Sequence, residues 1–251
     1  MLTTNNLTIR FGGHVAVDHV SCAFQPGTLT AIVGPNGAGK TTYFNLISGQ
    51  LRASEGSVHL GGVDITREAV SARTHRGLGR AFQLTQLFPN LSVVENVRLA
   101  VQSRRKQGLN LWSVWLDQRS TLDRAMELVA RVKLVPRANA SASSLPHGDQ
   151  RKLEVAMLMA LEPSVYMFDE PTAGMSVDDV PVILDLIREL KSERDKIILL
   201  VEHKMDVVRK LADRIIVLHN GQLVADGEPA AVIASPVVQQ AYLGVTSEEL
   251  A

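Results

Sequence analysis

Short apolar segments separated by glycine and proline turns fill the first part of the chain. LTIRF, HVAVDHVSCAF and LTAIV, within residues 5–33, alternate between apolar and polar positions or are continuously apolar. Alternation with a period of two is typical of β-strands, and Gly-Gly and Pro-Gly pairs are typical of turns. This region therefore predicts antiparallel strands that lead into a buried strand. Residues 57–66 predict a further hairpin around Gly61-Gly62.

The periodicity changes twice after that. From about residue 87 to residue 161, SVVENVRLAV and STLDRAMELVARVKL carry apolar residues three and four positions apart, which predicts amphipathic helices. SVYMFDEP and KIILLVEH then predict two buried strands with a helix, DVPVILDLIREL, between them. In DRIIVLHNGQLVADGEP, Asn220-Gly221 between apolar runs predicts a hairpin. Strands and helices in alternation, with continuously apolar strands, predict an α/β fold with a largely parallel sheet covered on both faces.

Composition narrows the classes of function. The 251 residues include 26 basic and 26 acidic side chains, so the formal net charge is zero. Nucleic acid is not expected as a partner, because its binding depends on positive charge. The single cysteine, Cys22, excludes an intramolecular disulfide and a multi-cysteine zinc site. The sequence has neither a secretory signal nor an apolar run of ~18 residues. We therefore expect a cytoplasmic protein, which a partner would have to hold at any membrane.

A glycine-rich loop supplies the strongest chemical signal. GPNGAGKTT, residues 34–42, matches the pattern G-x-x-x-x-G-K-[ST] and lies between a predicted buried strand and a predicted helix. In this pattern backbone N–H groups surround phosphate oxygens, and the N-terminus of the helix adds partial positive charge. Lys40 is expected to reach the β- and γ-phosphates, Thr41 to bind Mg²⁺, and Thr42 to bond the α-phosphate. The remaining residues expected to cradle phosphate are Gly34, Pro35, Asn36, Gly37, Ala38 and Gly39.

An acidic pair ends the predicted strand VYMFD. Asp169 is placed to hold Mg²⁺, and Glu170 to orient and deprotonate an attacking water. Two acids at the start of a loop are common, so the pair gains its meaning from the phosphate loop. His203 follows the next apolar strand. In isolation a capping role is the simpler interpretation of His203, whereas beside this site it points to the γ-phosphate. Gln83, in RAFQLTQLF, ends another short β-like segment and alone indicates nothing.

The order of these motifs carries a family resemblance. The phosphate loop, the FQ pair, the turn LPHGD, the FDEP segment and the EH pair together resemble the ATP-binding subunits of ABC transporters. The similarity extends from about Leu2 to Gly244, and RFGG, GLGRAFQLTQLFPNLSVVENV, EPTAGM and GEPAAVIASPVVQQAYLG resemble the high-affinity branched-chain amino-acid importers. The resemblance implies a single domain over residues 1–251. A P-loop (RecA-like) core with an antiparallel β lobe would occupy residues 1–86 and 162–251, and an inserted helical lobe residues 87–161.

The resemblance also implies roles at matching positions. Gln83 occupies the position that senses Mg²⁺ and the attacking water and couples to the membrane partner, and His203 that of a switch histidine. Phe11 falls where the family stacks an aromatic ring on adenine, and a core phenylalanine is the alternative. ATP and Mg²⁺ are the implied cofactors.

The helix start SLPHGDQRKLE departs from the family signature, which reads Leu-Ser-Gly-Gly-Gln. In the family this turn contacts the γ-phosphate bound to the other subunit, and Leu145, His147 and Gly148 are expected to do so here. Pro146 replaces the serine and has no group to donate, so we hypothesise that His147 supplies the donor. Ser176 stands where the family often has an aspartate that crosses the dimer interface. Both departures are more easily tolerated in a heterodimer.

By the same resemblance, the chain would power the import of branched-chain or related amino acids. The implied partners are a second ATP-binding subunit, with a heterodimer favoured, two transmembrane permease subunits and, indirectly, a periplasmic binding protein. The chain would lie peripherally on the cytoplasmic face of the inner membrane. A cassette acting in DNA repair, chromosome organisation or translation would show zinc cysteines, a long coiled-coil insertion or tandem cassettes, and the sequence has none of these. The ATPase subunit of another ABC system, either an importer of another solute or an exporter of the lipopolysaccharide type, stays open as the alternative. A soluble P-loop kinase has no need of the turn at 145–150 or of His203.

Overall fold

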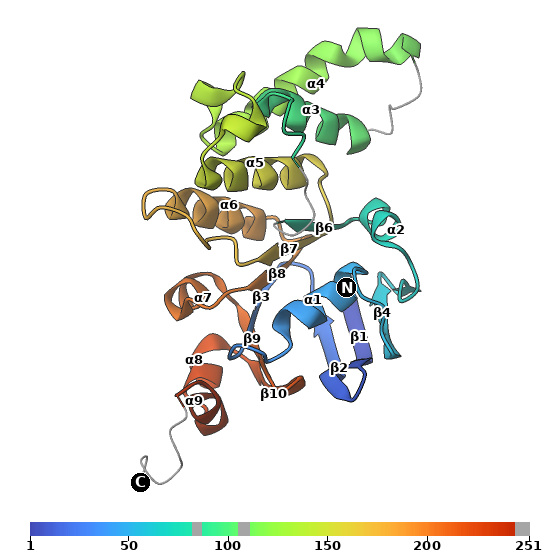
Figure 1. Ribbon diagram of the computed structural model, residues 1–251, viewed down its shortest axis with the longest axis vertical. Coiled ribbons are helices and arrows are strands. Elements are labelled where there is room, and N and C mark those ends of the chain that lie inside the picture. The colour runs from blue at the N-terminus through green and yellow to red at the C-terminus, as the bar shows by residue number, and fades with distance from the viewer. Residues whose placement is uncertain (82–86, 105–110, 244–251) are drawn as a thin grey trace. The chain divides into compact units, whose positions relative to one another are not determined.

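The chain divides into two compact units in the computed structural model, which describes residues 1–81, 87–104 and 111–243 (Figure 1). The first unit comprises residues 1–78, 164–170 and 191–251, and the second residues 79–163 and 171–190. The predicted apolar runs form strands and helices in both units, and predicted turn signals lie between strands. The mixed α/β architecture confirms the fold class that the sequence pattern predicts.

An antiparallel sheet of four strands begins the first unit. Its order is β2-β1-β4-β5, and the Gly12-Gly13 pair turns the chain between the first two strands. The turn between the last two strands lies at Gly61-Gly62, where both glycines have positive φ, as the sequence predicts. The strands of this sheet are β1 (Leu2–Phe11), β2 (His14–Phe24), β4 (Glu55–Leu60) and β5 (Val63–Asp64).

A second sheet, mainly parallel, carries the apolar strands. Its order is β10-β9-β3-β8-β7-β6, and β3 pairs in parallel with both β8 and β9. The last two strands of the chain form the predicted hairpin, with Asn220 and Gly221 at positive φ in the turn. The strands are β3 (Thr28–Val33), β7 (Val165–Asp169), β8 (Ile197–Val201), β9 (Arg214–His219) and β10 (Gln222–Gly227), while β6 (Leu78–Ala81) begins at the boundary between the units.

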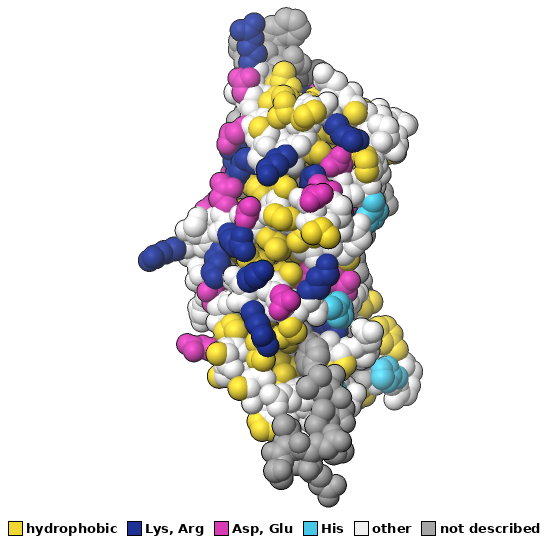
Figure 2. Space-filling view, turned by 90° about the vertical axis from the view of Figure 1, so that its left-hand side faces the viewer, with side chains coloured by type: hydrophobic (Ala, Val, Ile, Leu, Met, Phe, Trp, Pro, Cys, Tyr) yellow, Lys and Arg dark blue, Asp and Glu magenta, His cyan; other side chains and the backbone are white. Residues whose placement is uncertain are grey.

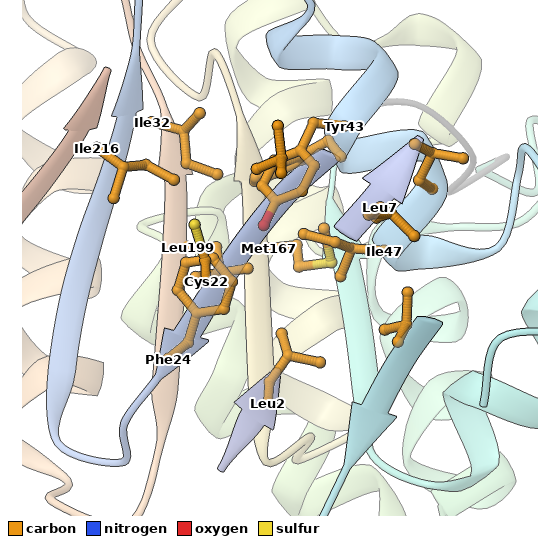
Figure 3. Close-up of a cluster of buried hydrophobic side chains, with 14 of the residues drawn as sticks. Leu2, Leu7, Cys22, Phe24, Ile32, Tyr43, Ile47, Met167, Leu199 and Ile216 are labelled. Atoms are coloured by element: carbon orange, nitrogen blue, oxygen red, sulfur yellow. The ribbon is translucent and has the colours of Figure 1, made fainter. Parts of the chain in front are cut away.

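Buried side chains from both sheets and from one helix form the main core of the first unit. Figure 3 shows Phe24, Tyr43, Met167 and Leu199 among the side chains of this cluster. Full burial of a large apolar side chain contributes roughly 1.5–3 kcal/mol. The hydroxyl of Tyr43 lies 2.7 Å from that of Thr4, so the one polar end in this group is hydrogen-bonded. The helices of this unit are α1 (Lys40–Ser48), α2 (Val70–His75), α7 (Met205–Leu211), α8 (Pro229–Ile233) and α9 (Pro236–Leu243).

A buried arginine fixes the C-terminal end of α1. The Arg73 side chain is 1% exposed, and its guanidinium donates to the carbonyl oxygens of Leu46 (2.8 Å) and Ile47 (2.6 Å) at the end of that helix. It also donates to the carbonyls of Thr66 (2.8 Å) and Glu68 (3.1 Å). The last carbonyls of a helix have no partner within the helix, so Arg73 satisfies the carbonyl of Ile47 and gives a second donor to that of Leu46, which also accepts from the N–H of Gly49 (3.3 Å).

The second unit is mainly helical. Buried Asn96 organises the loop before its first long helix, because its amide accepts from the backbone N–H of Phe88 (2.8 Å) and donates to the carbonyl of Ser92 (2.9 Å). The elements are α3 (Val93–Arg104), α4 (Leu111–Arg131), the short 3₁₀ turns at Val135–Arg137 and Ala142–Ser144, α5 (His147–Ala160) and α6 (Val180–Ser192), whose last two residues belong to the first unit.

The surface carries mixed charge. On the face drawn in Figure 2, basic and acidic side chains are interspersed with hydrophobic ones. Within the described part of the chain, no helix combines the length and the apolar character needed to cross a bilayer.

Candidate nucleotide site

A hollow of about 450 Å³ in the first unit is lined by most of the site residues that the sequence analysis predicts within that unit. Phe11, Glu170 and His203 lie around it together with the phosphate loop and the start of α1. Two residues that the sequence analysis missed, His14 and Ala16, also contribute. The full lining is Phe11, His14, Ala16, Asn36, Gly37, Ala38, Gly39, Lys40, Thr41, Thr42, Glu170 and His203.

The phosphate loop needs glycine at two of its positions. Gly39 immediately precedes α1 with φ +95°, and a Cβ there would lie 2.4 Å from the carbonyl oxygen of Ala16. Gly34 has φ +153°, and a Cβ there would lie 2.1 Å from the carbonyl oxygen of Leu218. No side chain caps the N-terminus of α1. The first N–H groups of a helix have no partner within the helix, so this terminus suits an anion.

The β9–β10 hairpin holds the loop from its other side. The N–H of Gly221 donates to the carbonyl of Ala38 (3.1 Å), while the carbonyl of Gly221 accepts from the N–H of Asp18 in β2 (2.8 Å). The tip of the hairpin is thus bonded both to the phosphate loop and to the antiparallel sheet. These contacts fix the loop backbone before any ligand arrives.

Lys40 is nearly enclosed by the loop that precedes it. Its side chain donates to the carbonyl of Gly34 (2.7 Å) and to that of Pro35 (2.8 Å), and the residue is 6% exposed. Burial lowers the pKa of the Lys40 ammonium, while the carboxylates of Glu170 and Asp169 oppose this shift. An ammonium has three donors, so two contacts to the loop leave one for a ligand.

Glu170 and His203 meet at the edge of the hollow. Oε1 of Glu170 and Nε2 of His203 are 2.8 Å apart, and both side chains are about two-fifths exposed. Glu170 has φ +50°, an uncommon conformation for a residue other than glycine, and its N–H donates to the carbonyl of Val201 (2.9 Å). The backbone turn directly after β7 therefore directs this carboxylate away from the strand.

A buried carboxylate to which the sequence analysis assigns no role supports His203. Glu202 is 3% exposed at the end of β8, and its Oε2 accepts from the backbone N–H groups of His203 (2.8 Å) and Lys204 (3.2 Å). These bonds hold the turn that carries the histidine at the start of α7. A glutamate before a predicted turn gives little signal in a single sequence, because it reads equally well as a surface residue.

The oxygen groups near the loop suit Mg²⁺. Thr41 lines the hollow, and Asp169 is 7% exposed at the end of β7, one residue before Glu170. Mg²⁺ prefers oxygen ligands and is usually held by one or two protein groups together with substrate phosphates. Within the part of the chain that the structure describes, no three His, Cys, Asp or Glu side chains could hold a metal by themselves. Thr41 and Asp169 supply oxygen groups of the kind that would hold a Mg²⁺ ion together with nucleotide phosphates.

The other predicted residues fall into three groups. Phe11 is 49% exposed beside the hollow, so it is not a core phenylalanine. Gln83 lies outside the described residues. Leu145, His147 and Gly148 belong to the second unit, where Leu145 is buried and His147 begins α5. Of the predicted residues, Phe11, Glu170, His203 and most of those in the phosphate loop therefore lie together around the hollow.

Comparison with known proteins gives this geometry a family. The family model described as ABC transporter matches residues 17–173. The chain belongs to the ABC transporter family. The high-affinity branched-chain amino acid transport ATP-binding protein LivG of Escherichia coli is 36% identical over 249 residues, covering 97% of this chain and 98% of LivG. Its counterpart BraF of Pseudomonas aeruginosa is 35% identical, with the same coverage.

Solved structures agree with this assignment. A nucleotide-free ATP-binding cassette from an ABC transporter has a TM-score of 0.81 and 29% identity, covering 98% of this chain and 99% of that one. A dimeric cassette in a post-hydrolysis state bound to ADP and Pi has a TM-score of 0.79 and 25% identity, covering 91% and 99%. The predicted P-loop NTPase fold and the family resemblance are both confirmed.

Proposed function

We propose that this chain is the ATP-hydrolysing subunit of an ABC importer for branched-chain or related amino acids. Its family membership and its full-length similarity to LivG and BraF support this proposal. The observation that carries the hydrolytic part is the hollow in which Lys40, the phosphate loop, Glu170 and His203 lie together. The amino-acid part rests on the printed names of the relatives.

The residues of the hollow divide the work of phosphoryl transfer. Lys40 and the loop N–H groups bind the β- and γ-phosphates, and Phe11 stacks on the adenine ring. Thr41, Asp169 and Gln83 would hold Mg²⁺, which when bound supplies charge neutralisation on the phosphates. Phosphoryl transfer depends mainly on positioning and electrostatic stabilisation, so fixed backbone donors are well suited to it.

Glu170 and His203 act on the attacking water and the γ-phosphate. Glu170 orients the water and accepts its proton. His203, 2.8 Å from that carboxylate, donates toward the γ-phosphate and holds Glu170 in place. Gln83 would report the state of the site to the membrane partner.

The second unit serves the partner subunit's nucleotide. Leu145, His147 and Gly148 at the start of α5 contact the γ-phosphate bound by a second ATP-binding subunit, with His147 replacing the hydroxyl that Pro146 lacks. The dimeric cassette bound to ADP and Pi supports a dimer, and we favour a heterodimer in the full transporter. Two permease subunits and, indirectly, a periplasmic binding protein complete the assembly on the cytoplasmic face of the inner membrane. If His147→Ala leaves nucleotide-dependent dimerisation and the ATPase rate unchanged, this role of His147 is wrong.

The test of hydrolysis is Glu170→Gln. The substitution keeps the size of the side chain and removes the base, so hydrolysis should slow by ~10²–10⁴-fold while ATP still binds. ATP affinity would be measured by equilibrium binding and hydrolysis by phosphate release. Glu193→Gln, a like change at an exposed glutamate of the same unit, is the matched control. An unaltered rate in Glu170→Gln would place the base elsewhere.

The test of import uses the assembled transporter. The chain, its permease partners and the binding protein would be reconstituted in vesicles, and ATP-dependent uptake of labelled leucine measured. Uptake should require ATP and should be lost in Glu170→Gln. ATP hydrolysis without uptake of leucine, or of any other branched-chain or related amino acid, would support the ATPase role and refute the amino-acid assignment.

A further inference from the structure

A buried lysine joins two segments of the second unit that are 27 residues apart. Lys152 lies in the second turn of α5, and its side chain is 8% exposed. Its Nζ donates to Oδ1 of Asp149 (3.0 Å) in the first turn of the same helix. It also donates to Oδ1 of Asp179, the residue that precedes α6. One ammonium therefore connects the start of α5 to the segment leading into α6.

The segment containing residues 174–179, the 174–179 turn, is itself ordered around Asp179. The hydroxyl of Ser176 donates to Oδ2 of Asp179 (2.8 Å), and the N–H of Asp179 donates to the carbonyl of Ser176 (3.1 Å). Ser176, which stands where the family often has an aspartate, is thus occupied within its own turn. Val177, by contrast, is an apolar side chain with 88% exposure.

The 174–179 turn also packs closely on residues 145–149, the signature turn. A Cβ on Gly148 would lie 3.0 Å from Oδ2 of Asp179, so the absence of a side chain allows this approach. A Cβ on Gly174 would lie 3.5 Å from the ring of His147. The two turns therefore approach closely at both glycines, and the lysine bridge is the bonded link beside them.

Charge explains why a cation belongs between the turns. Asp149 stands where the family signature has glutamine, and an unpaired carboxylate at this helix start would repel a phosphate brought by a partner. Lys152 and Arg137, whose Nε is 3.2 Å from Oδ2 of Asp149, balance the two carboxylates. Burial lowers the pKa of Lys152, but its bonds to Asp179 and Asp149 outweigh burial and raise it overall. The ammonium is therefore charged at neutral pH.

We propose that Lys152 is a positioning residue that locks the signature turn and the 174–179 turn into one rigid element facing the partner's nucleotide. The inference rests on the proposed function, because it assumes that a second ATP-binding subunit brings its nucleotide to this element. In this role Lys152 contacts neither ATP nor the attacking water. It acts by holding His147 and Gly148 at a fixed distance from the 174–179 turn.

The decisive variant is Lys152→Met, which keeps the length of the side chain and removes the ammonium. ATP binding by the isolated chain should be unchanged, because the phosphate loop lies in the other unit. The kcat for ATP hydrolysis by the assembled transporter should fall by about tenfold or more, since a small misplacement of a reacting group is costly. Lys152→Arg, which can still bridge the two carboxylates, should restore most of the lost rate.

The control is Arg188→Met, which removes a cation from an exposed ion pair with Asp185 on α6. Asp179→Asn breaks the bridge from its more exposed side, and it should reproduce the loss of kcat even if Lys152→Met fails to fold. A normal kcat in folded Lys152→Met or in Asp179→Asn, equal to that of Arg188→Met, would overturn the inference. Failure of the parent chain to bind ATP would instead refute the proposed function.

Discussion

Replacing Arg73 by methionine tests how strongly the end of α1 depends on one buried side chain. The guanidinium makes four bonds to backbone carbonyls, and hydrogen bonds to charged groups contribute about 1.5–3 kcal/mol each. The gross loss is therefore about 6–12 kcal/mol. Several kcal/mol return because the cost of burying the charge disappears, and each buried carbonyl left without a donor costs about 1–3 kcal/mol. We expect Arg73→Met to lower the free energy of unfolding by about 3–5 kcal/mol.

Arg76, three residues after Arg73, provides the control. Arg76 is 45% exposed and pairs with Glu68 at 2.6 Å, a surface ion pair worth about 0–1 kcal/mol. Arg76→Met should therefore leave stability nearly unchanged. Urea unfolding followed by circular dichroism would measure the free energy of unfolding of both variants. In thermal unfolding, the melting temperature of Arg73→Met should fall by about 6–20 °C. If the two variants unfold alike, the carbonyls of α1 find other partners and the reasoning fails.

Further predictions concern the loop, the histidine turn and the lysine bridge. Gly39→Ala should abolish ATP binding, because its Cβ would lie 2.4 Å from a carbonyl oxygen. Gly37→Ala is the control: its φ is similarly positive, but its Cβ would have no atom within 4 Å, so this variant should still bind ATP measurably. Equilibrium binding of ATP to the two variants is the measurement. Glu202→Ala should lower stability by about 2–4 kcal/mol and slow hydrolysis, because two backbone N–H groups lose a buried acceptor; unchanged urea unfolding would contradict this. Lys152 and Ser176 hold the pKa of Asp179 below its ordinary value, so this carboxylate stabilises the fold above about pH 4, and its contribution is lost as pH falls through the lowered pKa. The difference in stability between the native chain and Lys152→Met should therefore be constant from neutral pH to about pH 5 and shrink below about pH 4, as urea titrations at each pH would show.

The elements of the sheets were accessible from the sequence because their signals are local. Continuous apolar runs such as Ile197–Val201 are typical of strands buried on both faces of a parallel sheet, and Asn220-Gly221 specifies its own turn. The phosphate loop is equally local, since all its donors lie within nine residues. The lysine bridge is different, because Lys152 and Asp179 both look like surface charges until the fold brings them together.

Burial of single polar residues could not be read from the sequence either. Arg73 lies in a polar stretch, SARTHRG, yet it is among the largest fully buried side chains in the described part of the chain. For Phe11 the sequence left stacking and core packing open, and only the exposure of its ring beside the hollow excludes the core. Such outcomes depend on which distant carbonyls or surfaces arrive at the residue.

The bonds of Gly221 to the phosphate loop have a consequence for the order in which the protein matures. A ribosome makes residue 42 long before it makes residue 221, and β3 must wait for β8 and β9 to become its neighbours. A nascent chain halted before the terminal hairpin holds every letter of the glycine-rich motif but lacks the strand and the tip that set its backbone. The backbone of the phosphate loop thus acquires its final supports only late in synthesis.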